Sequence, residues 1–224
     1  MKLFKPSTTI EFNECNTEPS IITPLGTVNL SLYYGDLDIL LEKPNFNKVL
    51  PSGGRIYGWE ARNIIVETVI SNPPIYIPET MKMDSAVGIL IRILCETDNI
   101  SLRFLTYWSQ RCWEDGGSDT GQYLEASTWD KDCRRLSIGA EDSEYMVQRM
   151  NGNKLMPIRL RDSYDLVMSN EEGLTIELPS IRVNELCQFH VYIAWNSISN
   201  KYDASTWYAV DQSSEQILSF EALL

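Results

Sequence analysis

Strict alternation of apolar and polar residues is the feature that most constrains what this chain can fold into. Leucine and isoleucine alternate with threonine and glutamate in residues 174–178, and the same period of two returns in residues 87–95, 100–108 and 189–195. Side chains that alternate in this way belong to strands with one face turned to a core. The sequence therefore predicts an antiparallel β-sandwich, in which a polar turn at residues 169–173 joins two paired strands.

The alternation also assigns side chains to faces. Phe189, Val191, Ile193 and Trp195 share one face of a strand, with His190, Tyr192 and Ala194 on the other. Inward positions of this strand and of its predicted partners form the expected core, which includes Ile91, Phe104, Ile176, Val191 and Ile193.

Other stretches predict hairpins, loops and short helices. Residues 87–95 and 100–108, separated by a polar turn, predict a hairpin. Residues 35–44 have leucines at helical spacing, with Asp36 and Asp38 near the start, and predict a short amphipathic helix capped by those acids. A second helix is expected within residues 141–150. Two further regions are expected to be a long polar loop at residues 111–131 and a strand at residues 206–210. Long excursions between strands with little helix favour a jelly-roll sandwich.

The chain length favours one folded unit preceded by an arm. With 224 residues and 43% hydrophobic composition, a single core can bury about 70% of the unfolded surface. Residues 28–224 are therefore expected to form one jelly-roll domain. Residues 1–27 contain three prolines and few apolar residues, and predict an extended N-terminal arm that lies on a partner. Residues 8–12 within it could pair as a short edge strand.

The net charge limits the classes of partner, and the cysteine content indicates the redox state of the compartment. The net charge of −12 repels nucleic acid and anionic membrane surfaces, and the basic residues are scattered. Five widely spaced cysteines give no metal or redox motif, and Cys95 and Cys187 are expected to be buried thiols in a reducing compartment. No stretch predicts a signal peptide or a membrane span, so a cytosolic protein is expected.

Catalytic and cofactor motifs are not found, so no catalytic, cofactor-binding or metal-binding residue is assigned. His190 is the only histidine and lies within an apolar strand, where a structural role is favoured over catalysis. Cys187 is three residues away and points to the opposite face, which disfavours a cysteine–histidine dyad. The sequence contains no nucleophile elbow, phosphate loop or dinucleotide fingerprint. The protein is therefore expected not to be an enzyme.

Two features of the sequence leave open whether the protein binds a ligand. Residues 114–119 hold carboxylates and glycines without the spacing of an EF-hand, so a solvated turn is favoured over a weak Ca²⁺ site. Trp113 and Trp129 are expected to lie in loops, where tryptophan can stack on a sugar ring or anchor a protein interface.

Three segments resemble the jelly-roll capsid proteins of picorna-like viruses. Residues 32–50 resemble the strand and short leucine-bearing helix before the first barrel strand, and residues 100–106 resemble a strand that closes a hairpin before a long loop. Residues 164–167 followed by 174–180 are similar to an aromatic-Asp-Leu sequence, a polar turn and a strand that ends at a proline. The chain departs from that pattern in residues 178–181, which lack the tyrosine that follows the proline in the family, and at Glu42, where a second basic residue is usual.

The resemblance implies a non-enzymatic subunit of a viral capsid shell. Such a subunit assembles in the host cytoplasm into a virion, a large homo- or hetero-oligomer, through its loops and N-terminal arm, with other capsid subunits as partners. One alternative is an acidic cytosolic binding protein, such as an immunity protein or an inhibitor of a basic toxin or enzyme. Another is a carbohydrate-binding β-sandwich that uses its loop tryptophans.

Overall fold

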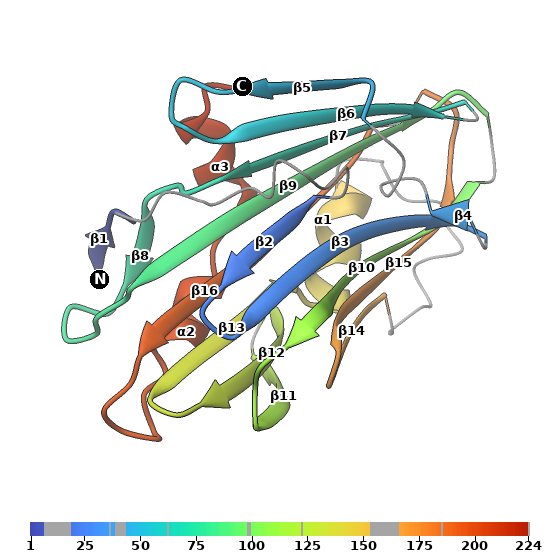
Figure 1. Ribbon diagram of the computed structural model, residues 1–224. Helices are drawn as coiled ribbons and strands as arrows, with labels where there is room; N and C mark the ends of the chain where they lie inside the picture. Colours follow the sequence, from blue (N-terminus) through green and yellow to red (C-terminus); the bar gives the residue numbers. More distant parts are fainter. Residues whose placement is uncertain are drawn as a thin grey trace.

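In the computed structural model, the described residues form an all-β protein with three short helices (Figure 1). The structure describes residues 1–6, 19–35, 37–38, 44–61, 63–97, 100–121, 123–152, 166–184 and 186–223. The elements are β1 (Lys2–Phe4), β2 (Ser20–Thr23), β3 (Gly26–Tyr34), β4 (Leu37–Asp38), β5 (Phe46–Val49), β6 (Arg55–Ala61), β7 (Ile64–Ser71), β8 (Ile75–Ile77), β9 (Ser85–Cys95), β10 (Ile100–Arg111), β11 (Asp115–Gly121), β12 (Leu124–Lys131), β13 (Arg134–Glu141), α1 (Ser143–Gly152), β14 (Val167–Asn170), β15 (Gly173–Ile181), β16 (Leu186–Ser197), α2 (Ser205–Val210) and α3 (Ser214–Phe220).

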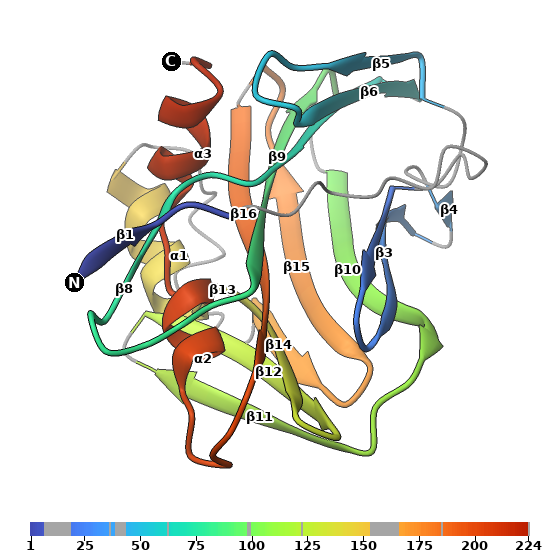
Figure 2. The ribbon, with the colours of Figure 1, turned by 60° about the vertical axis from the view of Figure 1, so that its left-hand side comes forward.

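Two antiparallel sheets pack face to face, as Figure 2 shows. The larger sheet has the order β11-β12-β13-β16-β9-β7-β6-β5, and the smaller has the order β14-β15-β10-β3-β2, with β4 paired to β3. A separate ribbon pairs β1 with β8. The prediction of an antiparallel β-sandwich is therefore confirmed, and the jelly-roll topology stays a prediction.

The main core fills the space between the two sheets. All five residues predicted for it, Ile91, Phe104, Ile176, Val191 and Ile193, are fully buried. Phe104 of the smaller sheet meets Phe189 of the larger one edge to face, with ring centroids 5.3 Å apart. The period-2 pattern identified this face correctly.

Helices α2 and α3 cover the outer face of the larger sheet and create a second apolar layer (Figure 2). Tyr192 and Ala194 project to this side and pack with Val210 of α2 and Ile217 of α3. The strands β9 and β16 are thus buried on both faces, which accounts for their near-continuous apolar sequence. The predicted helix within residues 141–150 is confirmed as α1.

The predicted hairpin of residues 87–95 and 100–108 is wrong. Both segments are strands, but β9 pairs with β7 and β16 while β10 pairs with β3 and β15, in the opposite sheet. Alternation describes the face that a strand buries and says nothing about its partner. Here the apolar faces of the two strands meet across the core instead of lying side by side in one sheet.

Part of the predicted N-terminal arm belongs to the sandwich. Residues 20–23 form β2, which pairs with β3, and Ile21 and Leu25 are fully buried in the main core. The boundary at residue 27 is therefore wrong, because residues 20–27 belong to the sandwich. The predicted strand at residues 8–12 lies outside the described residues.

Three further predictions are corrected. Residues 37–38, expected in a helix, form strand β4, while Asp36 and residues 39–43 lie outside the described part. Residues 206–210, expected as a strand, belong to helix α2. Most of the predicted loop at residues 111–131 is a regular hairpin, in which β11 pairs with β12 in an unbroken register from Asp115–Asp130 to Gly121–Leu124.

Candidate functional site

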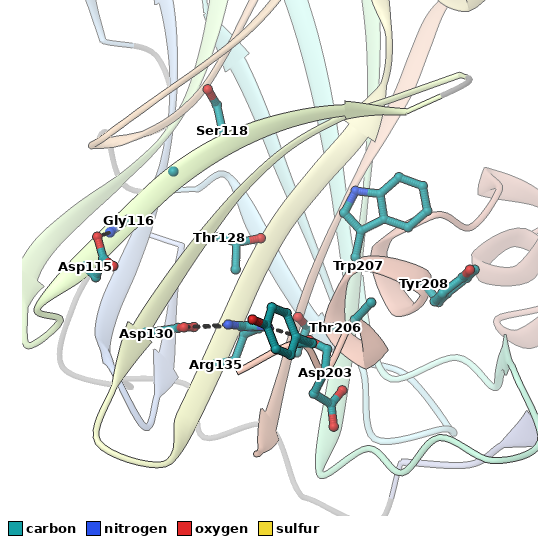
Figure 3. Close-up of a pocket in the computed structure, with 13 residues that line it drawn as sticks. Asp115, Gly116, Ser118, Thr128, Asp130, Arg135, Asp203, Thr206, Trp207 and Tyr208 are labelled. Atoms are coloured by element: carbon teal, nitrogen blue, oxygen red, sulfur yellow. Dashed lines mark hydrogen bonds and ion pairs between the residues drawn. The ribbon is translucent and has the colours of Figure 1, made fainter. Parts of the chain in front are cut away.

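A groove lies where the β11–β12–β13 end of the larger sheet meets the start of α2 (Figure 3). Its volume is about 510 Å³, within the range of small-molecule sites. Acidic, hydroxyl-bearing and aromatic side chains line it: Asp115, Gly116, Gly117, Ser118, Thr128, Asp130, Arg135, Tyr202, Asp203, Ala204, Thr206, Trp207 and Tyr208.

The edge strand β11 makes one wall of the groove. Its sequence from Asp115 to Gly121 contains no apolar side chain, so its place in the sheet depends on backbone pairing with β12. A Cβ added to Gly117 would meet nothing within 4 Å. Gly117 pairs with Thr128, a lining residue, and paired residues project to the same face. The missing side chain at Gly117 therefore leaves the groove open.

Arg135 links β12 and β13 to the loop of residues 198–204, part of which lines the other side of the groove. Its guanidinium donates to both oxygens of Asp130, at 2.7 and 2.6 Å, and to the backbone carbonyls of Lys201 and Asp203 (Figure 3). The hydrogen bonds with Asp130 raise the pKa of Arg135 further. Through these hydrogen bonds Arg135 holds the loop of residues 198–204 against β13.

Side-chain hydrogen bonds shape the loop and start helix α2. The carboxylate of Asp203 accepts from the backbone N–H of Ser205, which satisfies a donor at the helix start. Thr206 of α2 accepts from Ser137 of β13 at 2.8 Å, and Ser137 shares a second 2.8 Å hydrogen bond with Thr128. This chain of hydroxyls fixes the floor of the groove.

Three aromatic residues stand around this floor. Tyr202 is 79% exposed at the mouth, while Trp207 and Tyr208 are half-buried, with ring centroids 5.4 Å apart. The indole ring of Trp207 lies against Gly121, where an added Cβ would overlap it. The indole Nε1 of Trp207 is buried, and within the described part of the chain it has no hydrogen-bond partner.

The structure places His190 away from this groove. The His190 side chain is 2% exposed, its Nε2 lies 2.7 Å from the carbonyl oxygen of Gln212, and its Nδ1 lies 3.8 Å from Oε1 of Glu141. Cys187 is buried in the core on the opposite face of β16. The predicted separation of the two residues is confirmed, and His190 joins β16 to the segment between α2 and α3.

A smaller cavity of about 240 Å³ lies at the far end of α2. Tyr123 and Tyr145 stand beside it with ring centroids 4.8 Å apart, and Glu141 and Asp211 supply carboxylates. Partial burial raises the pKa of the Asp211 carboxyl group. This cavity holds no aligned nucleophile and base among the described residues.

The two tryptophans predicted to lie in loops have different surroundings. Trp113 does lie between strands, after β10. Trp129 belongs to β12, is 1% exposed and donates from its Nε1 to the carbonyl of Glu171 at 3.0 Å. Trp129 is therefore a core residue, packed edge to face on Trp108 at 5.3 Å, and the prediction of a loop position is wrong for it.

The acidic segment of residues 114–119 runs mainly along β11, so the favoured interpretation as a turn is wrong. Among the described residues, no group of three or more His, Cys, Asp or Glu side chains is placed to hold a metal ion. The helices that the structure describes are too short or too polar to cross a membrane.

The groove was not predicted from the sequence, because its residues come from separate elements. Signals for α2 were present: Asp203 and Ser205 are helix-start residues, and residues 206–210 lack the alternation of a strand. Nothing in the sequence pairs Arg135 with Asp130 and residues 201–203, because the turn between β12 and β13 and the path of the loop bring them together.

No protein-family model matches the sequence, and no curated protein matches it. Solved structures with a similar backbone include a protein described as a kojibiose phosphorylase from the human microbiome, at 11% identity and a TM-score of 0.48 over 97% of this chain. A bacterial glucoamylase complexed with acarbose gives 9%, 0.44 and 98%, and a polysaccharide lyase gives 8%, 0.44 and 91%. The chain spans 30%, 37% and 34% of these proteins, and none is similar enough to assign it a function.

Proposed function

We propose that this protein is a carbohydrate-binding β-sandwich whose ligand occupies the groove between β11–β13 and α2. The observation that carries the proposal is the combination of aromatic rings, exposed at Tyr202 and half-buried at Trp207 and Tyr208, with hydroxyl and carboxylate groups around one cavity of about 510 Å³. A sugar ring offers an apolar face to an aromatic ring and hydroxyls at its edge. Tyr202 and Trp207 suit the first, and Asp115 and Thr128 suit the second.

The lining supports a binding role without covalent chemistry. The groove contains no cysteine or histidine, and Asp130 and Asp203 are engaged by Arg135 and by the start of α2. The hydrogen bonds of Arg135 hold the loop that carries Tyr202 against β13. This contact preorganises the site, which reduces the entropy lost on binding.

Calorimetric titration against a panel of oligosaccharides tests the proposal. We expect Trp207→Ala and Tyr202→Ala each to weaken binding by about tenfold or more, through the loss of aromatic contact area. Tyr76→Ala is the matched control, because Tyr76 is 49% exposed on β8 and does not line the groove. If no oligosaccharide bound the wild-type protein, or if all three variants bound equally, the proposal would fail.

A second candidate is the shell subunit of jelly-roll type, with other subunits as partners. It is favoured by β5, an edge strand of the larger sheet whose residues are all exposed, including Phe46 at 49% and Val49 at 57%. An exposed apolar edge can pair with a strand of a neighbouring subunit. The acidic inhibitor stays a prediction motivated by the net charge of −12.

Light scattering tests the shell subunit. We expect a large particle from the wild-type protein and a monomer from Val49→Lys, which places a charge on the edge. Deletion of residues 1–18, which leaves Ile21 and Leu25 in the core, tests whether the first residues contribute to assembly. A wild-type protein that stays monomeric at all concentrations contradicts this candidate.

A further inference from the structure

We infer that the groove selects uncharged sugars and rejects acidic ones. The inference rests on the proposed carbohydrate-binding function and specifies its ligand class. Two observations lead to it: the balance of charge in the lining, and the engagement of Arg135 in hydrogen bonds within the protein.

The charge balance disfavours an anionic ligand. Asp115, Asp130 and Asp203 line the groove against a single cation, Arg135, so three negative charges and one positive charge leave a net charge of −2. A uronate carboxylate brought among these groups meets repulsion that a neutral sugar does not. Lys201, which is outside the lining, has its Nζ over the ring of Tyr202, 5.0 Å from the ring centroid.

The donors point to the same conclusion. An arginine in a sugar site normally offers a fork for a carboxylate, but Arg135 already donates to Asp130 and to two backbone carbonyls. The fork of Arg135 that would bind a carboxylate is therefore already occupied by Asp130.

Matched pairs of hexose and hexuronate trisaccharides in the gluco, galacto and manno series test this inference by calorimetry. We expect the neutral member of the bound pair to bind at least about tenfold more tightly than its uronate at low ionic strength. This ratio should shrink as salt rises, because ions screen the repulsion and leave the neutral sugar unaffected.

Two substitutions assign the effect to the groove. Asp115→Asn should reduce the preference for the neutral sugar severalfold, whereas Glu215→Gln, the same charge change at an exposed position of α3, should leave it unchanged.

The outcomes separate the two claims. A uronate that bound as tightly as its neutral partner would overturn the inference while carbohydrate binding stood. Equal effects of Asp115→Asn and Glu215→Gln would show that total charge, and not the groove, sets the preference. Failure of every trisaccharide to bind would overturn the proposed function, and the inference with it.

Discussion

The strand pair β9–β16 and the hairpin β11–β12 belong to the same sheet, yet they are stabilised in different ways. In β9 and β16 most side chains are buried, on both faces of the sheet. In β11 no side chain is apolar, and the hairpin is anchored by residues of β12, above all Trp129. A strand without apolar residues can therefore extend a sheet if its partner supplies the anchor, and its small side chains leave the adjacent groove open.

The strongest test of this difference is to remove the anchor. Trp129→Ala deletes the edge-to-face contact with Trp108 and the hydrogen bond to Glu171. We expect a loss of about 3–5 kcal/mol in the free energy of unfolding, measured by urea denaturation. Hydrogen exchange should rise in residues 115–131 before it rises in β9 and β16. Equal protection of both regions in the variant would contradict the anchoring role of Trp129.

A core substitution on β16 gives the other side of the comparison. Ile193 is fully buried between the sheets, and Ile193→Ala should cost about 2–5 kcal/mol. The expected loss of protection in this variant is global. Thr120→Ala on the exposed surface of β11 is the control, with a change within about 0.5 kcal/mol. An unchanged denaturation midpoint for Ile193→Ala would mean that the face is misassigned.

The sequence predicted the first of these regions well and the second poorly, for a physical reason. Burial leaves a period-2 signal in β9 and β16, so Ile91, Val191 and Ile193 could be placed in the core from their spacing alone. Backbone pairing leaves no such signal, so β11 read as a loop and Trp129 as a loop residue. The groove depends on contacts between distant segments, such as Arg135 with Asp203, and no local pattern encodes them.

Loss of the hydrogen bonds of Arg135 is expected to have an intermediate effect on the free energy of unfolding. Arg135→Gln removes the ion pair with Asp130 and the bonds to the carbonyls of residues 201 and 203. The pair is partly exposed, so we expect a modest cost of about 1–2 kcal/mol. Limited proteolysis should cut the loop of residues 198–204 faster in the variant. If cleavage there stayed at the wild-type rate, Arg135 would not be what orders the loop.

A pH dependence of the unfolding free energy is expected from the buried groups. Burial raises the pKa of Cys95 to about 11, above the ordinary value of about 8.5 for an unfolded cysteine. The folded protein therefore keeps a proton that the unfolded chain loses. Stability from this group is complete below about pH 8.5 and falls as the pH rises towards 11. Burial raises the pKa values of Tyr57 and Tyr192 as well, which acts in the same direction.

Unfolding free energies measured between pH 8 and pH 10.5 check this prediction. Cys95→Ala should show a shallower decline than the wild-type protein. Cys133→Ala is the control, since Cys133 is exposed in the turn between β12 and β13. Parallel declines in all three proteins would exclude a contribution from Cys95.

We propose that the space left by the small residues of β11 is a binding site. Filling that space is the most direct test of this proposal. Gly117→Leu places a side chain where no atom lies within 4 Å of an added Cβ, and its backbone does not require glycine. Thr120→Leu puts the same side chain three residues along the strand, on the opposite face. Oligosaccharide titration of both should show that Gly117→Leu abolishes binding with stability retained, while Thr120→Leu binds like the wild-type protein. Undiminished binding by folded Gly117→Leu would contradict the account.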